Sequence, residues 1–156
     1  MKMFFILLFI ISCTLAEPLD RKSDEAEAWS LIENASTRLT HEMATQNLGA
    51  LSSVETHNGT ETWNYINKTT KLQSWRIEFD SQRKMTRATY FPTAEGAVFN
   101  IKFLQVRWSK KNCTTEKTKT LILTHSHSIA GKMSCESGKY IVSFDSNNQI
   151  QEVEAR

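Results

Sequence analysis

The residues whose spacing could carry chemistry are two histidines, His125 and His127, separated by a single serine. In an extended strand, residues i and i+2 point to the same face. The two imidazoles could therefore bind one metal ion, or one of them could act as a general base. A catalytic zinc ordinarily has three protein ligands, and no third ligand is linked to this pair by spacing. We therefore expect no metal and no other cofactor, and His125 and His127 are the candidate ligand-binding residues.

Other catalytic constellations are absent from the sequence. There is no Gly-x-Ser-x-Gly nucleophile motif, and none of the five glycines is arranged to cradle a phosphate. Asp80 and Asp145 fall at expected strand ends, where either could act as a general acid or base, and nothing in their spacing favours one of them. Catalytic residues are therefore unassigned, and a non-enzymatic role is favoured.

Residues 1–16 have the composition of a secretory signal peptide. Lys2 gives the basic start, residues 4–11 the apolar stretch, and Ala16 a small residue at the expected cleavage point before Glu17. The apolar stretch is shorter than the ~20 residues that span a membrane. We expect a secreted, extracellular protein without a membrane anchor, in which a short polar segment, residues 17–22, precedes a single α+β domain, residues 23–156.

The cysteines and the glycosylation sequons fit that compartment. Cys13 leaves with the signal peptide, and Cys113 and Cys135 remain as a pair that we expect to form one intramolecular disulfide in an oxidising environment. Four Asn-x-Ser/Thr sequons mark candidate N-glycosylation sites, which are Asn34, Asn58, Asn67 and Asn112. The sequence therefore predicts a secreted glycoprotein.

The charge balance argues against two classes of partner. Without Lys2 the mature chain has 18 basic and 17 acidic side chains, a net charge of +1. Nucleic acids and anionic membranes are normally bound by a clustered positive field, so we expect neither as a partner. The 40% apolar and 23% charged residues are typical of one globular domain, whose partner would be a small molecule, a protein or a second copy of the chain.

A single long amphipathic helix is predicted from Ser23 to about Leu48. This stretch has neither proline nor glycine, Ser23 is a good N-cap, and Gly49 stands where a C-terminal cap belongs. Apolar residues recur with helical spacing at Ala28, Ile32, Ala35, Leu39 and Met43. Asn34 lies away from this apolar stripe, so the periodicity and the sequon agree.

An antiparallel sheet is predicted after Gly49, where β-branched and aromatic residues dominate and turn-forming residues recur between short runs. Alternating apolar residues predict strands with one buried face at residues 75–79 and 140–144, and a less regular strand at residues 62–68. The four tryptophans, Trp29, Trp63, Trp75 and Trp108, are expected in the core.

Two further predicted strands are irregular. The apolar face of residues 97–108 changes sides at Phe103-Leu104, which predicts a β-bulge in one long strand. Residues 120–129 are expected as another strand, with His125 and His127 on its apolar face. Because a single strand there would hold the two cysteines apart, we expect a turn near residues 129–131 that brings residues 132–136 back toward Cys113.

The C-terminal sequence resembles the ending of a known family. A strand pattern from Tyr140 to Phe144 is followed by Asp145 in a polar turn and by a last run from Gln149 to Val153. This arrangement is similar to the end of nuclear transport factor 2-like proteins, a cone family within the cystatin-like α+β superfold. The resemblance implies one long N-terminal helix packed on a bent antiparallel sheet. Many members carry two or three short helices where this sequence predicts one, which leaves open the simpler cystatin arrangement and the presence of a pocket.

A non-enzymatic binding or interaction module, with a small apolar ligand or a protein as partner, is the favoured function. The first alternative is a secreted cone-fold isomerase, dehydratase or hydrolase that uses an inward-facing histidine. The second is a cystatin-type protease inhibitor, because the residues from Gln151 to Ala155 approach the Gln-x-Val-x-Gly motif of that family. Alanine in the glycine position and the C-terminal location make a chance match the better explanation.

Overall fold

An antiparallel sheet of eight strands makes up most of the described chain. The computed structural model describes residues 21–48, 50–66, 72–92, 99–124 and 127–156. The helices are α1 (Arg21–Glu33), α2 (Ala35–Arg38), α3 (His41–Asn47) and α4 (Ile101–Arg107). In the spatial order β1-β2-β3-β4-β8-β7-β6-β5, the strands are β1 (Ala50–His57), β2 (Thr60–Ile66), β3 (Gln73–Phe79), β4 (Met85–Tyr90), β8 (Ile150–Ala155), β7 (Tyr140–Phe144), β6 (His127–Cys135) and β5 (Cys113–Thr124).

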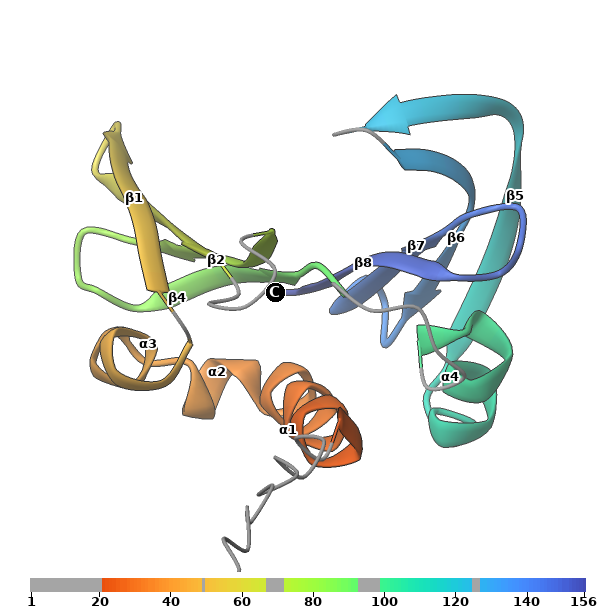
Figure 1. The fold of residues 1–156 in the computed structure, drawn as a ribbon, viewed down its shortest axis with the longest axis horizontal. Coiled ribbons are helices and arrows are strands. Elements are labelled where there is room, and N and C mark those ends of the chain that lie inside the picture. Colours follow the sequence, from red (N-terminus) through yellow and green to blue (C-terminus); the bar gives the residue numbers. More distant parts are fainter. Residues whose placement is uncertain (1–20, 49, 67–71, 93–98, 125–126) are drawn as a thin grey trace, which may run out of the picture.

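All of these helices lie on one side of the sheet, and the two edges of the sheet, β1 and β5, rise away from them (Figure 1). The sheet consists of two four-stranded meanders, β1–β4 after α1–α3 and β5–β8 after α4. The meanders join through β4 and β8, where Ala88, Thr89 and Tyr90 lie opposite Ala155, Glu154 and Val153. The predicted architecture, one long helix on a bent sheet, is therefore wrong, because short helices back a sheet that makes up most of the fold.

The predicted helix from Ser23 to Leu48 is broken into α1, α2 and α3. Asn34 (φ −121°) and Leu39 (φ −100°, ψ 52°) leave the helical region, and Thr40 is extended. The Thr40 hydroxyl accepts the Met43 N–H at 3.2 Å and so caps a new helix. Short polar side chains of this kind offer the backbone local alternatives to a continuous helix. Thr40 thus accounts for the second break, whereas the first break, at Asn34, has no side-chain cap.

Residues 101–107 form helix α4 rather than part of a bulged strand, so the predicted bulge at Phe103-Leu104 is also wrong. The Asn100 side chain accepts the Lys102 N–H at 3.0 Å and caps the helix. Ile101, Leu104 and Trp108 are buried, at positions i, i+3 and i+7. The change of parity in the apolar pattern was therefore helical periodicity, which places three residues on one face.

The strands predicted at residues 75–79 and 140–144 are confirmed as β3 and β7, and Trp75, Ile77 and Phe79 are buried. The irregular strand at 62–68 corresponds to β2, in which Trp63 and Tyr65 face the core. The Asp145 carboxylate accepts the backbone N–H groups of Asn147 and Gln149, so it closes the turn into β8. All four tryptophans are buried, as predicted.

The strand predicted at residues 120–129 is wrong, because the chain reverses direction within it. Thr124 at the end of β5 lies opposite His127 at the start of β6. The reversal comes before the turn that we placed near residues 129–131. A register shift between Lys117 and Ile122 then sets Cys113 directly opposite Cys135. These two residues form a disulfide with a Cα–Cα distance of 4.0 Å, so the predicted bridge is confirmed.

Tyr65 carries a buried hydroxyl without a hydrogen-bond partner in the described chain. The residue is 1% exposed, and burial raises its pKa to about 12. A buried polar group without a partner costs about 1–3 kcal/mol, so Tyr65→Phe is expected to raise the free energy of unfolding by about 1 kcal/mol. Urea denaturation measures the change.

Tyr140→Phe is the matched control for Tyr65→Phe. The Tyr140 hydroxyl donates to the Glu33 backbone carbonyl at 3.0 Å, so its removal is expected to destabilise the protein by about 1 kcal/mol. Effects of the same sign in the two variants would contradict the assignment of Tyr65 as the unpaired hydroxyl.

Candidate functional site

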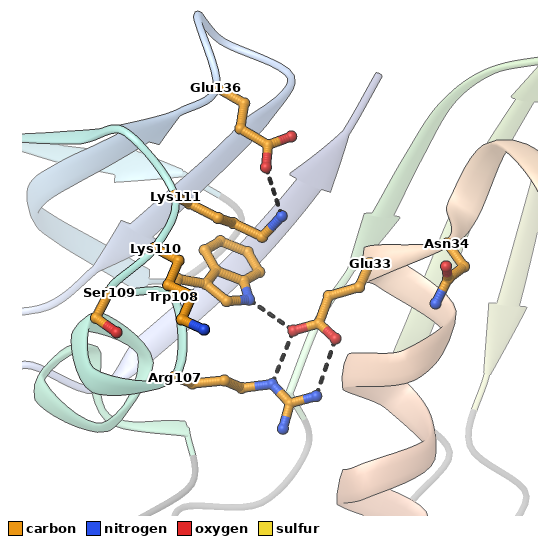
Figure 2. Close-up of a pocket in the computed structure, with 8 residues that line it drawn as sticks. All are labelled: Glu33, Asn34, Arg107, Trp108, Ser109, Lys110, Lys111 and Glu136. Atoms are coloured by element: carbon orange, nitrogen blue, oxygen red, sulfur yellow. Dashed lines mark hydrogen bonds and ion pairs between the residues drawn. The ribbon is translucent and has the colours of Figure 1, made fainter.

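An open pocket of about 630 Å³ lies where the end of α1 meets the end of α4 and the β6–β7 turn (Figure 2). Glu33 and Asn34 supply one wall, residues 107–111 the opposite wall, and Glu136 the rim. Elements far apart in the sequence therefore meet here, and charged side chains dominate the lining.

The Glu33 carboxylate is held from two sides. Arg107 donates from Nε and Nη2 to its two oxygens at 2.8 and 2.9 Å, and Trp108 Nε1 donates to Oε1 at 2.6 Å (Figure 2). Burial on its own would raise the pKa of Glu33. The hydrogen bonds from Arg107 and Trp108, together with the charges of Arg107 and Lys111, outweigh burial and lower that pKa below its ordinary value.

Glu33 should therefore stabilise the fold in a pH-dependent way. Because its folded pKa is lowered, this contribution is present above the unfolded pKa of about 4.3 and is lost as the pH falls through the folded pKa. We expect Glu33→Gln to lower the free energy of unfolding by about 1–2 kcal/mol at neutral pH and by much less in acid. Urea denaturation across the pH range measures this, with Glu27→Gln, an exposed position of α1, as the control. A loss that is independent of pH would contradict it.

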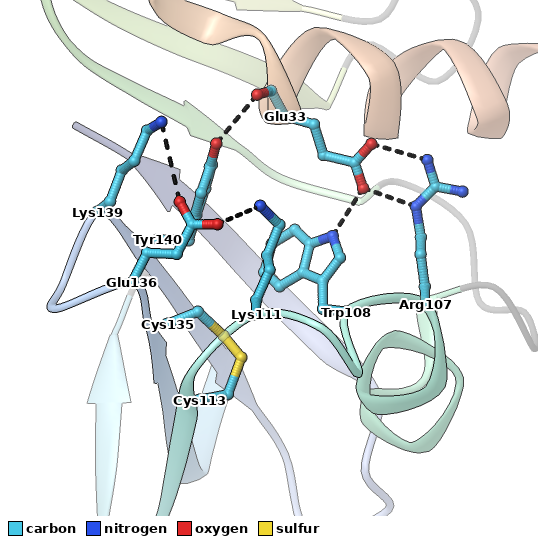
Figure 3. Close-up of polar contacts among 9 residues, drawn as sticks. All are labelled: Glu33, Arg107, Trp108, Lys111, Cys113, Cys135, Glu136, Lys139 and Tyr140. Atoms are coloured by element: carbon cyan, nitrogen blue, oxygen red, sulfur yellow. Dashed lines mark hydrogen bonds and ion pairs between the residues drawn. A yellow bond between two sulfur atoms is a disulfide. The ribbon is translucent and has the colours of Figure 1, made fainter.

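A second ion pair joins the pocket to the β6–β7 turn (Figure 3). Lys111 Nζ donates to Glu136 Oε1 at 2.6 Å and lies 4.6 Å from the centre of the Tyr140 ring. Lys139 Nζ lies 3.9 Å from the other Glu136 oxygen. The hydrogen bond from Lys111 is the largest effect on Glu136, and it lowers the pKa of that carboxyl.

The disulfide holds this second ion pair in place. Cys113 follows Lys111 by two residues, and Cys135 directly precedes Glu136 (Figure 3). The Glu136 N–H also donates to the Asn112 carbonyl at 2.9 Å. Both carboxylates of the pocket thus stay ionised and are paired with cations, which makes them poor proton donors near neutral pH. The geometry fits a rigid junction better than acid–base catalysis.

The opposite face of the sheet bears a polar surface. We use "helix-free face" for the side chains that alternate with the core residues and point away from the helices, because no helix covers that side within the described residues (Figure 1). Strand register assigns to it Ser53, Glu55, Thr62, Asn64, Arg76, Glu78, Arg87, Thr89, Glu152, Glu154, Ile141, Ser143, Lys132, Ser134, Thr114 and Glu116.

Polar contacts link these side chains across neighbouring strands. Asn64 donates to Ser53 at 3.0 Å and accepts from Arg76 at 3.2 Å, which connects β1, β2 and β3. Arg87 on β4 lies 3.3 Å from Glu78 on β3 and 3.6 Å from Glu154 on β8. Ser143 on β7 donates to Glu152 on β8 at 3.0 Å. The helix-free face is thus an ordered array of charged groups.

The predicted ligand-binding role of His125 and His127 stays a prediction. His125 lies outside the described residues, and of His127 only the strand position, opposite Thr124, is described. Asp80 and Asp145 each accept two backbone N–H groups in their turns, so both have structural roles. No group of three metal-ligating side chains occurs within the ranges that the structure describes.

Three of the four sequons are at exposed asparagines, Asn34, Asn58 and Asn112, whereas Asn67 lies outside the described residues. Within those residues, no helix is long and apolar enough to cross a membrane.

Sequence reasoning missed the residues that make the pocket and the helix-free face. Glu33 and Arg107 are 74 positions apart, so no local motif links them. The i, i+3, i+7 pattern after Asn100 was the signal that could have placed Arg107 at a helix end. Comparison of the chain with protein-family models, with characterised proteins and with solved structures finds no match.

Proposed function

We propose that this chain is a secreted, N-glycosylated interaction protein that binds a protein partner on its helix-free face. The Cys113–Cys135 disulfide and the exposed sequon asparagines support an extracellular setting. Intact mass of the secreted protein, before and after enzymatic deglycosylation, tests this part. A mass equal to that of the bare chain would contradict glycosylation.

The observation that carries the binding function is the ordered charge array on the helix-free face. Paired side chains such as Arg76 with Asn64 lose less conformational freedom on binding than free side chains do. In contrast, large aromatic residues fill the layer between helices and sheet, where the Trp29 ring centre lies 5.8 Å from those of Phe99 and Trp108. This packing favours surface recognition over an interior apolar ligand.

The dimensions of the helix-free face suit a folded protein. At about 4.8 Å per strand spacing and 3.3 Å per residue, a sheet of this size offers roughly 600 Å², close to the ~800 Å² that each partner contributes to a standard interface. The face has five carboxylates and three cations, so the partner surface should be net positive.

The test measures binding to a protein partner captured from extracellular fluid. It compares the wild type with two variants in which a glutamate is replaced by lysine. Glu154→Lys changes the centre of the face, and Glu27→Lys makes the same charge change on exposed α1. We expect Glu154→Lys to raise the Kd at least about tenfold, mainly through slower association at low salt, and Glu27→Lys to leave it unchanged. Equal affinities for wild type and Glu154→Lys would contradict binding on this face.

A further inference from the structure

Among the described residues, strand β1 is an open edge of the sheet. It pairs on one side with β2 and is the terminal strand of the described sheet. Every residue from Leu51 to His57 is exposed. An edge strand presents backbone N–H and C=O groups that can pair with another chain.

The two edges of the sheet differ in their protection against such pairing. Edge strands are commonly blocked by lysine or proline. Strand β5, at the other edge, contains Lys117 and Lys119, whereas β1 has neither lysine nor proline. The register of β1 shifts between Leu51 and Ser53 and is regular from Ser53 to His57. That regular stretch is available for pairing.

Apolar side chains gather at the β1 edge. Leu51 is 48% exposed and Val54 47% exposed, although they lie opposite the buried residues Tyr65 and Trp63. Both side chains therefore point to the helix side of the sheet, but α3 does not cover them. Met43 on α3 is 37% exposed, and α3 lies below β1 (Figure 1). Three of the six exposed large apolar side chains in the described chain are thus on these two elements.

We infer that β1 pairs antiparallel with β1 of a second copy of this chain. A two-fold axis through Val54 sets it opposite Val54 of the other copy and sets Glu55 opposite Ser53. No like charges lie directly opposite in this register, whereas sliding one strand by two residues, which moves the two-fold axis to Glu55, would set Glu55 against Glu55. The pairing buries Val54 and brings the α3 helices of the two copies side by side.

The consequence goes beyond the proposed partner binding. A two-fold axis perpendicular to the sheet keeps the same face of both copies on the same side. The two helix-free faces then form one continuous surface that presents each charged group twice. The dimer forms without any partner, so its test is independent of the partner test.

Sedimentation equilibrium of the full glycosylated chain, over a wide concentration range, tests the pairing. We expect a reversible dimer in the wild type and at least about a tenfold higher Kd in Val54→Lys, because a charge then faces its copy across the pair. Thr115→Lys is the matched control, since Thr115 is exposed on the other edge strand and also points to the helix side. It should dimerise like the wild type.

A cysteine pair provides a positive readout. Val54→Cys should form an intermolecular disulfide under mild oxidation, and Thr115→Cys should not, because directly opposed Cβ atoms in an antiparallel pair come within about 4.5 Å, which a disulfide can span. Thermal unfolding confirms that each variant is folded. A monomer at every concentration, or a dimer equally stable in Val54→Lys, overturns the inference.

Discussion

Replacing both bridging cysteines, Cys113→Ala with Cys135→Ala, should lower the free energy of unfolding by about 3 kcal/mol. The bridge closes a loop with a sequence separation of 22, and its loss gives the unfolded chain more conformational freedom. Alanine is chosen because Cys135 is 0% exposed, so a serine hydroxyl there would be buried. Urea denaturation with and without a thiol reductant measures the effect.

Reduction provides the internal control for the cysteine variant. A reductant should destabilise the wild type by a similar amount and should leave the double alanine variant unchanged. The Lys111–Glu136 ion pair should also weaken, since both residues flank the bridge. Free thiols in the purified wild type, or stability unaffected by reductant, would contradict the structural role of the disulfide.

Gly131→Ala should destabilise the protein by about 2–3 kcal/mol through overpacking. A Cβ at Gly131 would overlap the ring of Phe144 and would lie 2.9 Å from the Glu116 backbone carbonyl. Phe144 is 3% exposed, so its ring has little room to move, and the carbonyl belongs to the neighbouring strand β5. Thermal and urea denaturation both report the change.

Two further variants separate the causes of this effect. Gly138→Ala places its Cβ in open space at a φ of +90°, so it carries only a conformational cost of about 1 kcal/mol. Phe144→Leu makes room for a Cβ at position 131. In a double-mutant cycle, Gly131→Ala should therefore destabilise the Phe144→Leu variant less than it destabilises the wild type. Equal costs for Gly131→Ala and Gly138→Ala would show that crowding is not the cause.

The strand pattern was predictable where one face is buried and one is exposed. Trp75, Ile77 and Phe79 alternate with polar residues, and Asp145 stands where its side chain closes a turn, so β3 and the β7–β8 hairpin follow from local sequence. The disulfide was predictable as well, because only two cysteines remain after the expected leader.

The helices were harder to predict, because side-chain caps can end a helix that the apolar periodicity would continue. The apolar stripe through Leu39 predicts one helix, yet the Thr40 side chain caps a new one, and local hydrogen bonds of that kind leave no trace in apolar spacing. Apolar residues at 101, 104 and 108 fit a helix, while the run as a whole also fits two half-strands. In such short segments, tertiary packing selects between the two.

The candidate sites were the least predictable part. The contact between Glu33 and Arg107 needs α1 and α4 to meet, and the array on the helix-free face needs the register of eight strands. Neither is encoded in a local motif. The role of His125 and His127 stays a prediction, because His125 lies outside the described residues and only the strand position of His127, opposite Thr124, is described.

The strand order also sets the sequence in which the fold can assemble. Within the described sheet, all neighbouring strands except β4 and β8 are consecutive along the chain. Each meander can therefore form through contacts between residues close in sequence, with a small loss of chain entropy. The β4–β8 seam joins residues more than sixty positions apart through three opposed pairs. We therefore expect each half-sheet to form before the two dock at this seam, which makes the docking the late, slow step of folding.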